Sequence, residues 1–353
     1  MLLLGSIVAL VVSFYLLAQV SDKYFIESLD KIAHRFNMSH DMAGATLMAI
    51  GSSAPELFVA IIALVKPGDH GEIGIGTIVG SAVFNILGII GAVAVVRKSV
   101  LAWQPVLRDL IFYSISIITL IVVFYDSQIE LYEGAILIFI YGFYLLAVSK
   151  WRKLFPYEEL DTIEEEEEGE GEGEEEAPVW EKVFRPFDYA IDKLFPPIRY
   201  YYGVFFISII VIALLSWVLV ESAVIISEML NIPKVVIALT VLAIGTSVPD
   251  LMSSVIVAKQ GRGGMALSNA VGSNIFDILI CLGLPWLLII SFSKTPLPVK
   301  TDDLFVSVIL LFSSVLIILA LLVINNWSIG KKAGIFLLLL YLAYVIREFY
   351  LAI

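Results

Sequence analysis

The chain has little cysteine, little histidine and, over most of its length, little charge. Cys281 is the only cysteine among 353 residues, so no intrachain disulfide can form. The three histidines, His34, His40 and His70, do not cluster, and no Cys/His group indicates a soft transition-metal site. Segment 158–176 holds 13 acidic residues and no base, so the net charge of −12 belongs mainly to one loop. Nothing in this charge pattern indicates nucleic-acid binding.

Long apolar runs make up most of the chain instead. Hydrophobic residues account for 59% of it, which excludes an ordinary soluble globule and indicates a membrane protein. Runs of membrane-spanning length occur at about 2–20, 42–65, 73–96, 109–125, 131–149, 203–226, 235–258, 265–290, 304–324 and 333–352. The predicted fold class is therefore an all-α polytopic membrane protein with ten transmembrane helices, five in each half.

Positive charge is spread unevenly over the predicted loops. With the N-terminus outside, 17 of the 22 Lys and Arg residues fall on the inner side and five on the outer side. Because inner loops of membrane proteins carry the excess of Lys and Arg, we predict a cell-membrane protein with both termini outside and the acidic loop in the cytoplasm. The predicted divisions are a first five-helix repeat at 1–150, the acidic cytoplasmic loop at 151–200 and a second repeat at 201–353.

Two pairs of segments repeat between the halves. Residues 46–57 read TLMAIGSSAPEL and residues 240–251 read TVLAIGTSVPDL; GSAVFNIL at 80–87 likewise matches GSNIFDIL at 272–279. With five helices per half, the second copy must insert upside down relative to the first. The pattern predicts an inverted-topology repeat, an architecture of secondary transporters with the binding site near the midplane.

The first repeated motif places oxygen atoms around a helix break. Pro55 has no N–H and its ring clashes with the carbonyl of Gly51, so the helix must bend and free carbonyls near Gly51 and Ser52. Ser52 and Ser53 add hydroxyl groups, and Glu56 adds a carboxylate. The same reasoning applies in the second half to Gly245, Thr246, Ser247, Pro249 and Asp250.

Glu56 and Asp250 are acids in the middle of apolar runs. Each costs about 2.5–3.5 kcal/mol to insert at a bilayer centre. A structural alternative is that each acid forms an ion pair with a basic residue, but Arg347 is the only basic residue within the ten runs. Together the two acids balance two positive charges, and carboxylate, hydroxyl and carbonyl oxygens are ligands for calcium and sodium.

The second repeated motif adds four polar residues to the predicted site. Ser81 and Asn85 are four residues apart, as are Ser273 and Asp277, so each pair shares a helix face. The neutral Asn85 matches the acidic Asp277, which indicates a third titratable or cation-binding group. A structural hydrogen-bonding role for Asp277 is the alternative.

Both motifs resemble the alpha-repeats of the cation/calcium antiporter superfamily. The resemblance rests on GATLMAIGSSAPELF and on LTVLAIGTSVPDLMSSVIVAKQGRGGMALSNAVGSNIFDILICLGLPW, and it covers roughly residues 1–150 and 200–353. AGATLMAIGSSAPELF, GTSVPDLM, VAKQG and SNIFDIL are most similar to the potassium-dependent sodium/calcium exchangers. Gly264 departs from that branch, which tends to have an acid there.

The resemblance implies ten helices, an inverted repeat and a central calcium site. Glu56 and Asp250 would be bidentate carboxylates shared by calcium and sodium, and Ser52 and Thr246 would add carbonyl oxygens. The flanking sodium sites would be lined by Ser53, Ser81, Ser247 and Ser273 and by the carbonyls of Ala49 and Ala243. Asn85 and Asp277 would complete the centre. The position of Asp277 governs potassium in that branch, although some potassium-independent microbial relatives also have Asp there.

The predicted function is secondary-active exchange of cytosolic calcium for extracellular sodium, with or without potassium co-transport. The two cations compete for the same acids, and the first and sixth helices (about 1–36 and 201–230) slide over a fixed core. A calcium/proton exchanger is the nearest alternative, followed by a passive calcium channel and by a calcium-sensing scaffold that uses the acidic loop. We expect no enzymatic activity and no cofactor. The expected partners are the bilayer and the transported calcium, sodium and potassium ions, with the protein working as a monomer.

Overall fold

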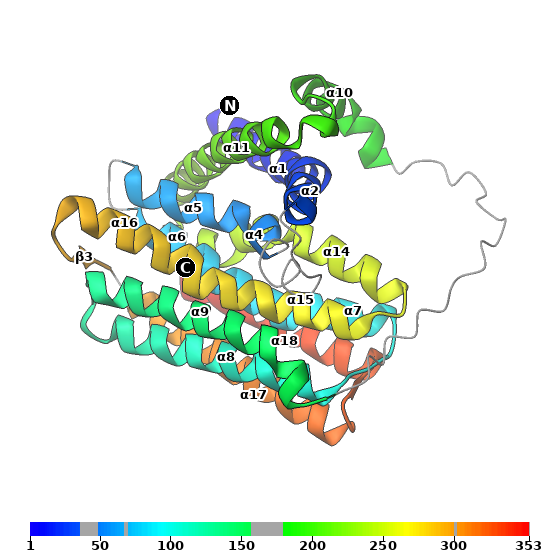
Figure 1. The fold of residues 1–353 in the computed structure, drawn as a ribbon. Helices are drawn as coiled ribbons and strands as arrows, with labels where there is room; N and C mark the ends of the chain where they lie inside the picture. Colours follow the sequence, from blue (N-terminus) through cyan, green and yellow to red (C-terminus); the bar gives the residue numbers. More distant parts are fainter. Residues whose placement is uncertain (36–48, 67–69, 157–178, 300–301, 353) are drawn as a thin grey trace.

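The computed structural model describes residues 1–35, 49–66, 70–156, 179–299 and 302–352 (Figure 1). These residues form helices joined by short connections, with four two-residue strands. This all-helical architecture agrees with the predicted fold class.

Helices of the first part of the chain are often divided by short π-helical or 3₁₀ segments, labelled η. They are α1 (Leu2–Val20), η1 (Ser21–Ile26), α2 (Glu27–Arg35), α4 (Ala49–Ser52), α5 (Ala54–Val65), α6 (Gly71–Val83), η3 (Phe84–Ile89), α7 (Ile90–Val96), α8 (Trp103–Val123), η4 (Phe124–Asp126) and α9 (Leu131–Leu154). The strands β1 (Ser99–Val100) and β2 (Gln128–Ile129) lie before and after α8.

The later part of the chain repeats much of this pattern. It contains α10 (Val179–Leu194), η5 (Ile198–Tyr200), α11 (Tyr201–Leu230), α12 (Lys234–Ile237), η6 (Ala238–Leu242), α13 (Ala243–Thr246), α14 (Val248–Lys259), α15 (Gly263–Phe276), η7 (Asp277–Leu282), α16 (Gly283–Ser293), α17 (Asp302–Ile324) and α18 (Lys331–Ala352). The strands β3 (Leu297–Pro298) and β4 (Ser328–Ile329) lie before and after α17.

Eight helical segments among the described residues are long and apolar enough to cross a membrane. A ninth is the bent pair Lys234–Thr246 and Val248–Lys259, whose halves meet at 44°. The remaining predicted run, 42–65, begins outside the described residues and continues as α4 and the short apolar helix α5. The structure thus accounts for eight of the ten predicted spans as continuous helices.

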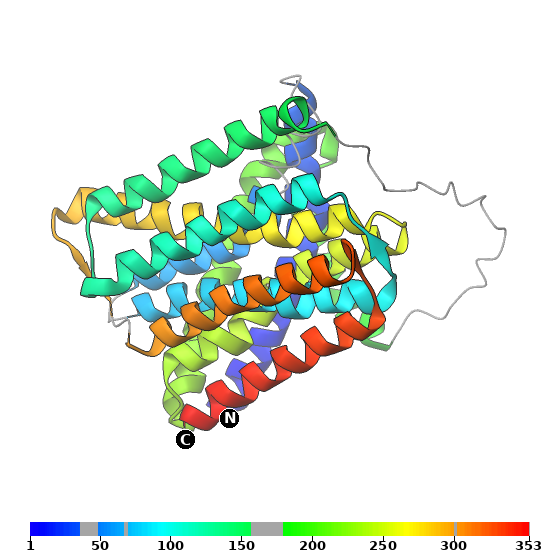
Figure 2. The same ribbon diagram turned by 90° about the horizontal axis from the view of Figure 1, so that it is seen from below.

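Two helices cross over one face of the rest of the bundle. Figure 1 shows α1 and α11 side by side above the bundle, with α10 higher still, and Figure 2, seen from below, shows α1 behind the bundle. Their apolar side chains form a core with α5, which includes Leu17 and Leu219, while α6 to α9 and α15 to α18 share a second core around Trp286. The first of these cores therefore joins α5, with further residues from α6, α12 and η6, to the helices predicted to move.

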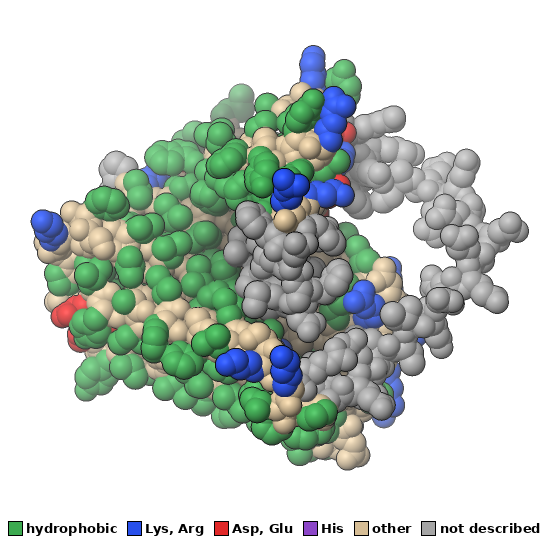
Figure 3. Space-filling model, in the orientation of Figure 1, with side chains coloured by type: hydrophobic (Ala, Val, Ile, Leu, Met, Phe, Trp, Pro, Cys, Tyr) green, Lys and Arg blue, Asp and Glu red, His purple; other side chains and the backbone are tan. Residues whose placement is uncertain are grey.

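The outer surface of the bundle is apolar. Hydrophobic side chains form a broad band over the face in Figure 3, with Lys and Arg gathered at its ends. Phe139 and Phe143 on α9 and Phe292 on α16 are among the exposed aromatic residues. Such a surface is suited to contact with lipid.

The short strands connect the two halves of the chain. β1 pairs with β4 and β2 pairs with β3, both antiparallel. Ser99 lies opposite Ile329, and Gln128 lies opposite Pro298. The connection before α8 therefore pairs with the connection after α17, and the connection after α8 pairs with the connection before α17.

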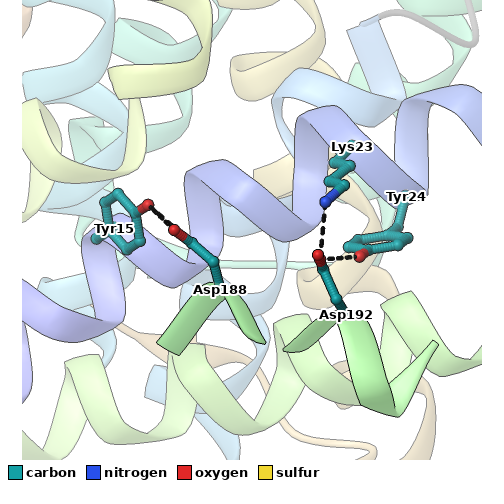
Figure 4. Close-up of polar contacts among 5 residues, drawn as sticks. All are labelled: Tyr15, Lys23, Tyr24, Asp188 and Asp192. Atoms are coloured by element: carbon teal, nitrogen blue, oxygen red, sulfur yellow. Dashed lines mark hydrogen bonds and ion pairs between the residues drawn. The ribbon is translucent and has the colours of Figure 1, made fainter. Parts of the chain in front are cut away.

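Helix α10 lies within the segment predicted as a loop, and it is attached to the first helix (Figure 4). Asp188 accepts hydrogen bonds from the Tyr15 hydroxyl at 2.8 and 2.9 Å. Asp192 pairs with Lys23 at 2.7 Å and accepts a hydrogen bond from Tyr24 at 2.5 Å. These contacts are between side chains, so sequence patterns did not reveal them.

Candidate cation-binding site

The two repeated motifs break their helices in the same way. Ser53 separates α4 from α5 with φ −92° and ψ 8°, and Ser247 separates α13 from α14 with φ −89° and ψ 9°. Pro55 and Pro249 are the second residues of the helices that follow, where a missing N–H costs no helical hydrogen bond. The predicted breaks are confirmed, and the dihedral angles show that both motifs adopt one conformation.

The second repeated motif lies on two matching π-helical segments. Asn85 is the second residue of η3, and Asp277 is the first residue of η7. Both side chains are fully buried. π-Helical turns are uncommon and occur often at functional sites, because the extra residue in the turn redirects a side chain.

Close helix packing brings the halves together at this level. A Cβ atom on Gly80 would lie 2.3 Å from the carbonyl oxygen of Leu239 and 2.7 Å from the Cβ of Ala243, so only glycine fits there. This contact presses α6 against η6 and α13. It places Ser81 of the first half beside the Ala243 carbonyl of the second half, to which its hydroxyl donates at 3.2 Å.

Asp250 is held by side chains from both halves. Its Oδ2 atom accepts hydrogen bonds from Ser273 at 2.8 Å and from the Asn85 amide at 3.3 Å. Ser273 in turn lies 2.8 Å from the hydroxyl of Ser53. Ser52 also hydrogen-bonds to the Asp250 carboxylate. The carboxylate is thus oriented by hydroxyl and amide groups, as a fixed ligand requires.

Glu56 has equivalent surroundings on the other break. Ser247 donates a hydrogen bond to its Oε1 atom at 3.2 Å, and Thr246 also hydrogen-bonds to the carboxylate. The Thr246 hydroxyl lies 3.4 Å from that of Ser81. Asp277 makes hydrogen bonds with Ser53 and Cys281.

Four side-chain oxygens of the site are buried without a hydrogen-bond partner. They are Glu56 Oε2, Asn85 Oδ1, Asp250 Oδ1 and Asp277 Oδ2. In each residue the other polar atom makes a contact. A buried oxygen without a partner is unfavourable by about 1–3 kcal/mol, and by more when it carries charge. A cation that all four oxygens approach would remove this cost.

The charges of the three acids act on one another. Glu56 and Asp250 repel, and Asp277 repels both. No Lys or Arg among the described residues forms an ion pair with them. The described carboxylate, imidazole and thiol groups contain no three that lie close enough to hold a metal ion by themselves. Calcium takes six to eight oxygens, so hydroxyl, amide and carbonyl groups must supply the rest.

Eleven of the twelve predicted site residues are described at the side-chain level, and they come together. They are Ser52, Ser53, Glu56, Ser81, Asn85, Ala243, Thr246, Ser247, Asp250, Ser273 and Asp277, all of them buried. The side chain of Ala49 lies outside the described part of the structure. Its backbone begins α4, directly before the first break.

Sequence reasoning missed Asn274. Its Oδ1 atom accepts from Asn85 at 2.9 Å, and its own amide donates at 3.0 Å both to the carbonyl of Ala82 and to the hydroxyl of Tyr113. Asn274 thereby fixes the orientation of Asn85. The available signal was a difference between repeats, since Asn274 matches Ala82 in the first half.

Cys281 lies beside the site rather than only in a general core. Its thiol is 3.7 Å from the Ser53 carbonyl and 3.6 Å from Asp277 Oδ1. Its side chain is fully buried.

Comparison with known proteins identifies the family. The model of the family described as "Sodium/calcium exchanger protein" matches residues 6–150 and 200–350. Sodium/potassium/calcium exchanger 5 of Homo sapiens is 32% identical over 94% of this chain and 80% of its own. Sodium/potassium/calcium exchanger 4 of Homo sapiens is 29% identical over 93% of this chain and 78% of its own.

Solved structures give the same result. The sodium-calcium exchanger NCX_Mj, soaked with Na⁺ and Sr²⁺, is similar with a TM-score of 0.59 and 26% identity, over 98% of both chains. The fold and the two broken helices define an ion exchanger of the membrane. The chain belongs to the sodium/calcium exchanger family, which confirms the resemblance seen in its motifs.

Proposed function

We propose that the protein is a secondary-active antiporter that exchanges calcium for sodium across a membrane. The observation that carries this proposal is the set of four unpartnered buried oxygens on Glu56, Asn85, Asp250 and Asp277. They lie where two identically broken helices meet, and three of the four side chains are acids. Such a set of oxygen ligands binds hard cations best.

Glu56 and Asp250 are the residues shared by calcium and sodium. Ser52 and Thr246 contribute carbonyl oxygens at the ends of α4 and α13. The remaining ligands are Ser53, Ser81, Ser247 and Ser273, the carbonyls of Ala49 and Ala243, and the central pair Asn85 and Asp277. This assignment is supported by the hydrogen bonds that bring these residues together.

Competition for one set of acids couples the two fluxes. Glu56 and Asp250 repel each other when no cation lies between them. A site with this uncompensated charge is unfavourable at the middle of a bilayer. The site therefore changes between its two access states only while it holds calcium or sodium. Calcium crosses in one direction and sodium in the other, so a complete cycle exchanges the two cations.

The finer architecture in the proposal is ten helices arranged as two inverted five-helix repeats. The ladder pairing supports it: α8 separates β1 from β2, yet β1 pairs with β4 and β2 pairs with β3. These partners are possible only when α17 runs opposite to α8. Two close glycine contacts also join the two halves in a symmetric way. Gly91 of α7 contacts Gly334 of α18, and Gly134 of α9 contacts Gly283 of α16.

Access to the site alternates when α1 and α11 slide over the other helices. The position of these two helices across the outside of the bundle supports this part of the proposal (Figure 1). We further propose a monomer in the cell membrane with both termini outside, and with the acidic segment and α10 on the cytoplasmic side. The excess of Lys and Arg in the inner connections supports this orientation.

Potassium co-transport is the second candidate property. Asp277 adds a third acid to the site, and the two human relatives are named for potassium as well as sodium and calcium. A third negative charge increases the positive charge that the loaded site balances.

Calcium uptake into proteoliposomes tests the proposed function. Uptake should require an outward sodium gradient, and a potassium titration should show whether potassium is carried as well. Uptake driven equally well by a proton gradient without sodium would instead identify a calcium/proton exchanger. Uptake that follows the calcium gradient alone would identify a channel.

A further inference from the structure

One side of helix α10 is packed on the first helix. Asp188 and Asp192 make the polar contacts drawn in Figure 4. Ile191 and Phe195 are buried in the core of α1 and α11, and the Phe195 ring stacks on Tyr24 with 3.8 Å between the ring centroids. These four residues of α10 and its end are spaced by three and four positions, so they form a single side of the helix.

The remaining surface of α10 is exposed, and it combines apolar groups with positive charge. Tyr189 is 72% exposed and Leu194 is 54% exposed. Lys193 is exposed as well, and it forms no ion pair with the described residues. Asp188 and Asp192 both contact the first helix. The acids of the described part of α10 therefore do not neutralise its exposed surface.

The contacts of α10 place it at the boundary of the apolar span. Tyr15 lies inside the apolar run 2–20 of the first helix, and Lys23 lies just beyond the end of that run. Five residues of helix separate Tyr15 from Val20, so the Tyr15 contact is at most about 8 Å inside the run. Amphipathic helices in a membrane interface enter it to about 5–10 Å. α10 therefore lies at the depth of such a helix.

The exposed surface of α10 continues onto the lipid-facing side of α11. Arg199 and Tyr200 follow α10 and are both exposed, with the guanidinium group 4.8 Å from the centre of the ring. Tyr202, Phe206 and Ile210 are exposed at intervals of four along α11. Tyrosine and arginine at the end of an exposed apolar stripe are typical of the membrane–water interface. Figure 1 shows α10 as the outermost element above α1 and α11, where lipid would otherwise cover them.

We propose that α10 is an interfacial helix whose exposed surface binds anionic lipid headgroups. Leu194 and Tyr189 enter the boundary between headgroups and acyl chains, as apolar side chains of interfacial helices do. Lys193 and Arg199 contact the negatively charged groups of the lipid, to which basic residues at a membrane surface are attracted. This inference goes beyond ion exchange, because it assigns the protein a lipid partner at a surface away from the cation site.

The acidic segment 158–176 is the other occupant that this chain could supply. It has negative charge for Lys193, but it has no apolar residue between Glu164 and Glu176. It would therefore leave Tyr189 and Leu194 in water. A lipid layer has acyl chains and anionic headgroups at adjacent depths, so it matches both kinds of exposed group on α10.

Fluorescence quenching in nanodiscs tests the contact with lipid. In a Cys281→Ala background, a fluorophore on Leu194→Cys should be quenched by nitroxides placed near the headgroup end of the acyl chains. The quenching should be about twofold or more above that of a fluorophore on Gln260→Cys, an exposed residue in the connection between α14 and α15. Equal quenching at the two positions would overturn the proposal and favour a soluble partner for α10.

Hydrogen–deuterium exchange of the whole protein tests the selectivity for anionic lipid. Adding about one third phosphatidylserine to phosphatidylcholine nanodiscs should slow exchange in peptides from 179–194 by about threefold or more. Lys193→Gln with Arg199→Gln should remove most of this slowing. The matched control, Lys331→Gln with Lys332→Gln, removes two exposed basic residues at the start of α18 and should preserve it. Equal exchange in the two lipid compositions, or the same loss in both double variants, would contradict the proposal.

Deletion of 162–176 separates lipid from the acidic segment as the occupant. The deletion should leave the quenching at Leu194 unchanged and should keep or increase the effect of phosphatidylserine, because it removes a competitor for the same basic residues. Faster exchange of peptides 179–194 in phosphatidylcholine after the deletion would show that the acidic segment covers α10, and the proposal would be wrong. None of these measurements depends on ion transport, so a failure of the proposed function would leave their result intact.

Discussion

The Asn85 amide has an orientation set by its two hydrogen bonds. Its Nδ2 group donates to Asn274 and to Asp250, so Oδ1 remains as an acceptor without a protein partner. At the matching position of the second repeat, Asp277 presents a carboxylate. At this pair of positions the two repeats are alike in being π-helical and differ by one acidic group, which in the proposed site sets how much positive charge is balanced.

Glu56→Gln should abolish calcium exchange while the protein remains folded. The amide keeps the size of the side chain and its contact with Ser247, but it removes one of the three carboxylates of the proposed site. Loss of a charged calcium ligand should reduce uptake by about 100-fold or more. Uptake in proteoliposomes, together with the elution profile of the purified variant, measures both properties. Near-parental uptake would exclude Glu56 as a shared ligand.

Asp277→Asn should fold, since Asn85 already occupies the equivalent position in the first repeat. The loaded site would balance one positive charge fewer, so sodium/calcium exchange should persist at a reduced rate and any potassium activation should disappear. The measurement is sodium-driven calcium uptake across a potassium titration, with parent and variant compared in parallel. Full potassium activation in the variant would show that another residue is the determinant.

At the scale of helices, the packing of α6 on η6 sets the geometry of the site. Gly80→Ala would place a methyl group 2.3 Å from the Leu239 carbonyl oxygen. Backbone atoms cannot yield as side chains do, so we expect a loss of about 1–3 kcal/mol in stability, with weakened exchange. Gly142→Ala on α9 is the control because nothing lies within 4 Å of its added Cβ. The thermal midpoint should fall only in Gly80→Ala.

Helix α10 should follow the first helix because two acids attach it there. Replacing both, Asp188→Asn with Asp192→Asn, should speed hydrogen–deuterium exchange in peptides from 179–194 while Glu228→Gln does not. Hydrogen bonds from Lys23 and Tyr24 hold the pKa of Asp192 below its ordinary value. A lowered folded-state pKa means that this contact is complete above about pH 4 and is lost only in stronger acid. The protection that this contact gives the parent peptides should therefore be the same at pH 6 and at pH 8.

The sequence predicts the parts of the molecule that depend on local chemistry. Pro55 and Pro249 restrict their own backbone, so the breaks followed from the repeated motif, and the apolar runs gave the helices. The helix α10, within the predicted loop 151–200, could not be predicted from the sequence, because its contacts with Tyr15 and Lys23 join residues about 170 positions apart. Asn274 was missed for the same reason, since its role depends on groups from three other segments.

For the whole molecule, the proposed mechanism changes the position of α1 and α11 relative to the other helices. Lys66, at the end of α5, forms an ion pair with Glu221 of α11. Glu221 is 20 residues beyond the start of α11, or about 30 Å along a helix, so this contact lies far from α10. When α11 slides past α5, the ion pair must separate. The proposed motion therefore predicts that the contact is present in one access state and absent from the other.

Cross-linking these two positions should stop exchange reversibly. In a Cys281→Ala background, Lys66→Cys with Glu221→Cys should lose uptake after a short reducible bis-thiol reagent is added, and should regain it after reduction. Cys281 is buried beside the site, so the background variant is first shown to exchange normally. Each single cysteine variant should keep its activity under the same treatment, because one attached reagent joins nothing. Cross-linked protein that exchanges calcium at the uncross-linked rate would show that α5 and α11 move together, and the sliding of α11 over α5 would then be wrong.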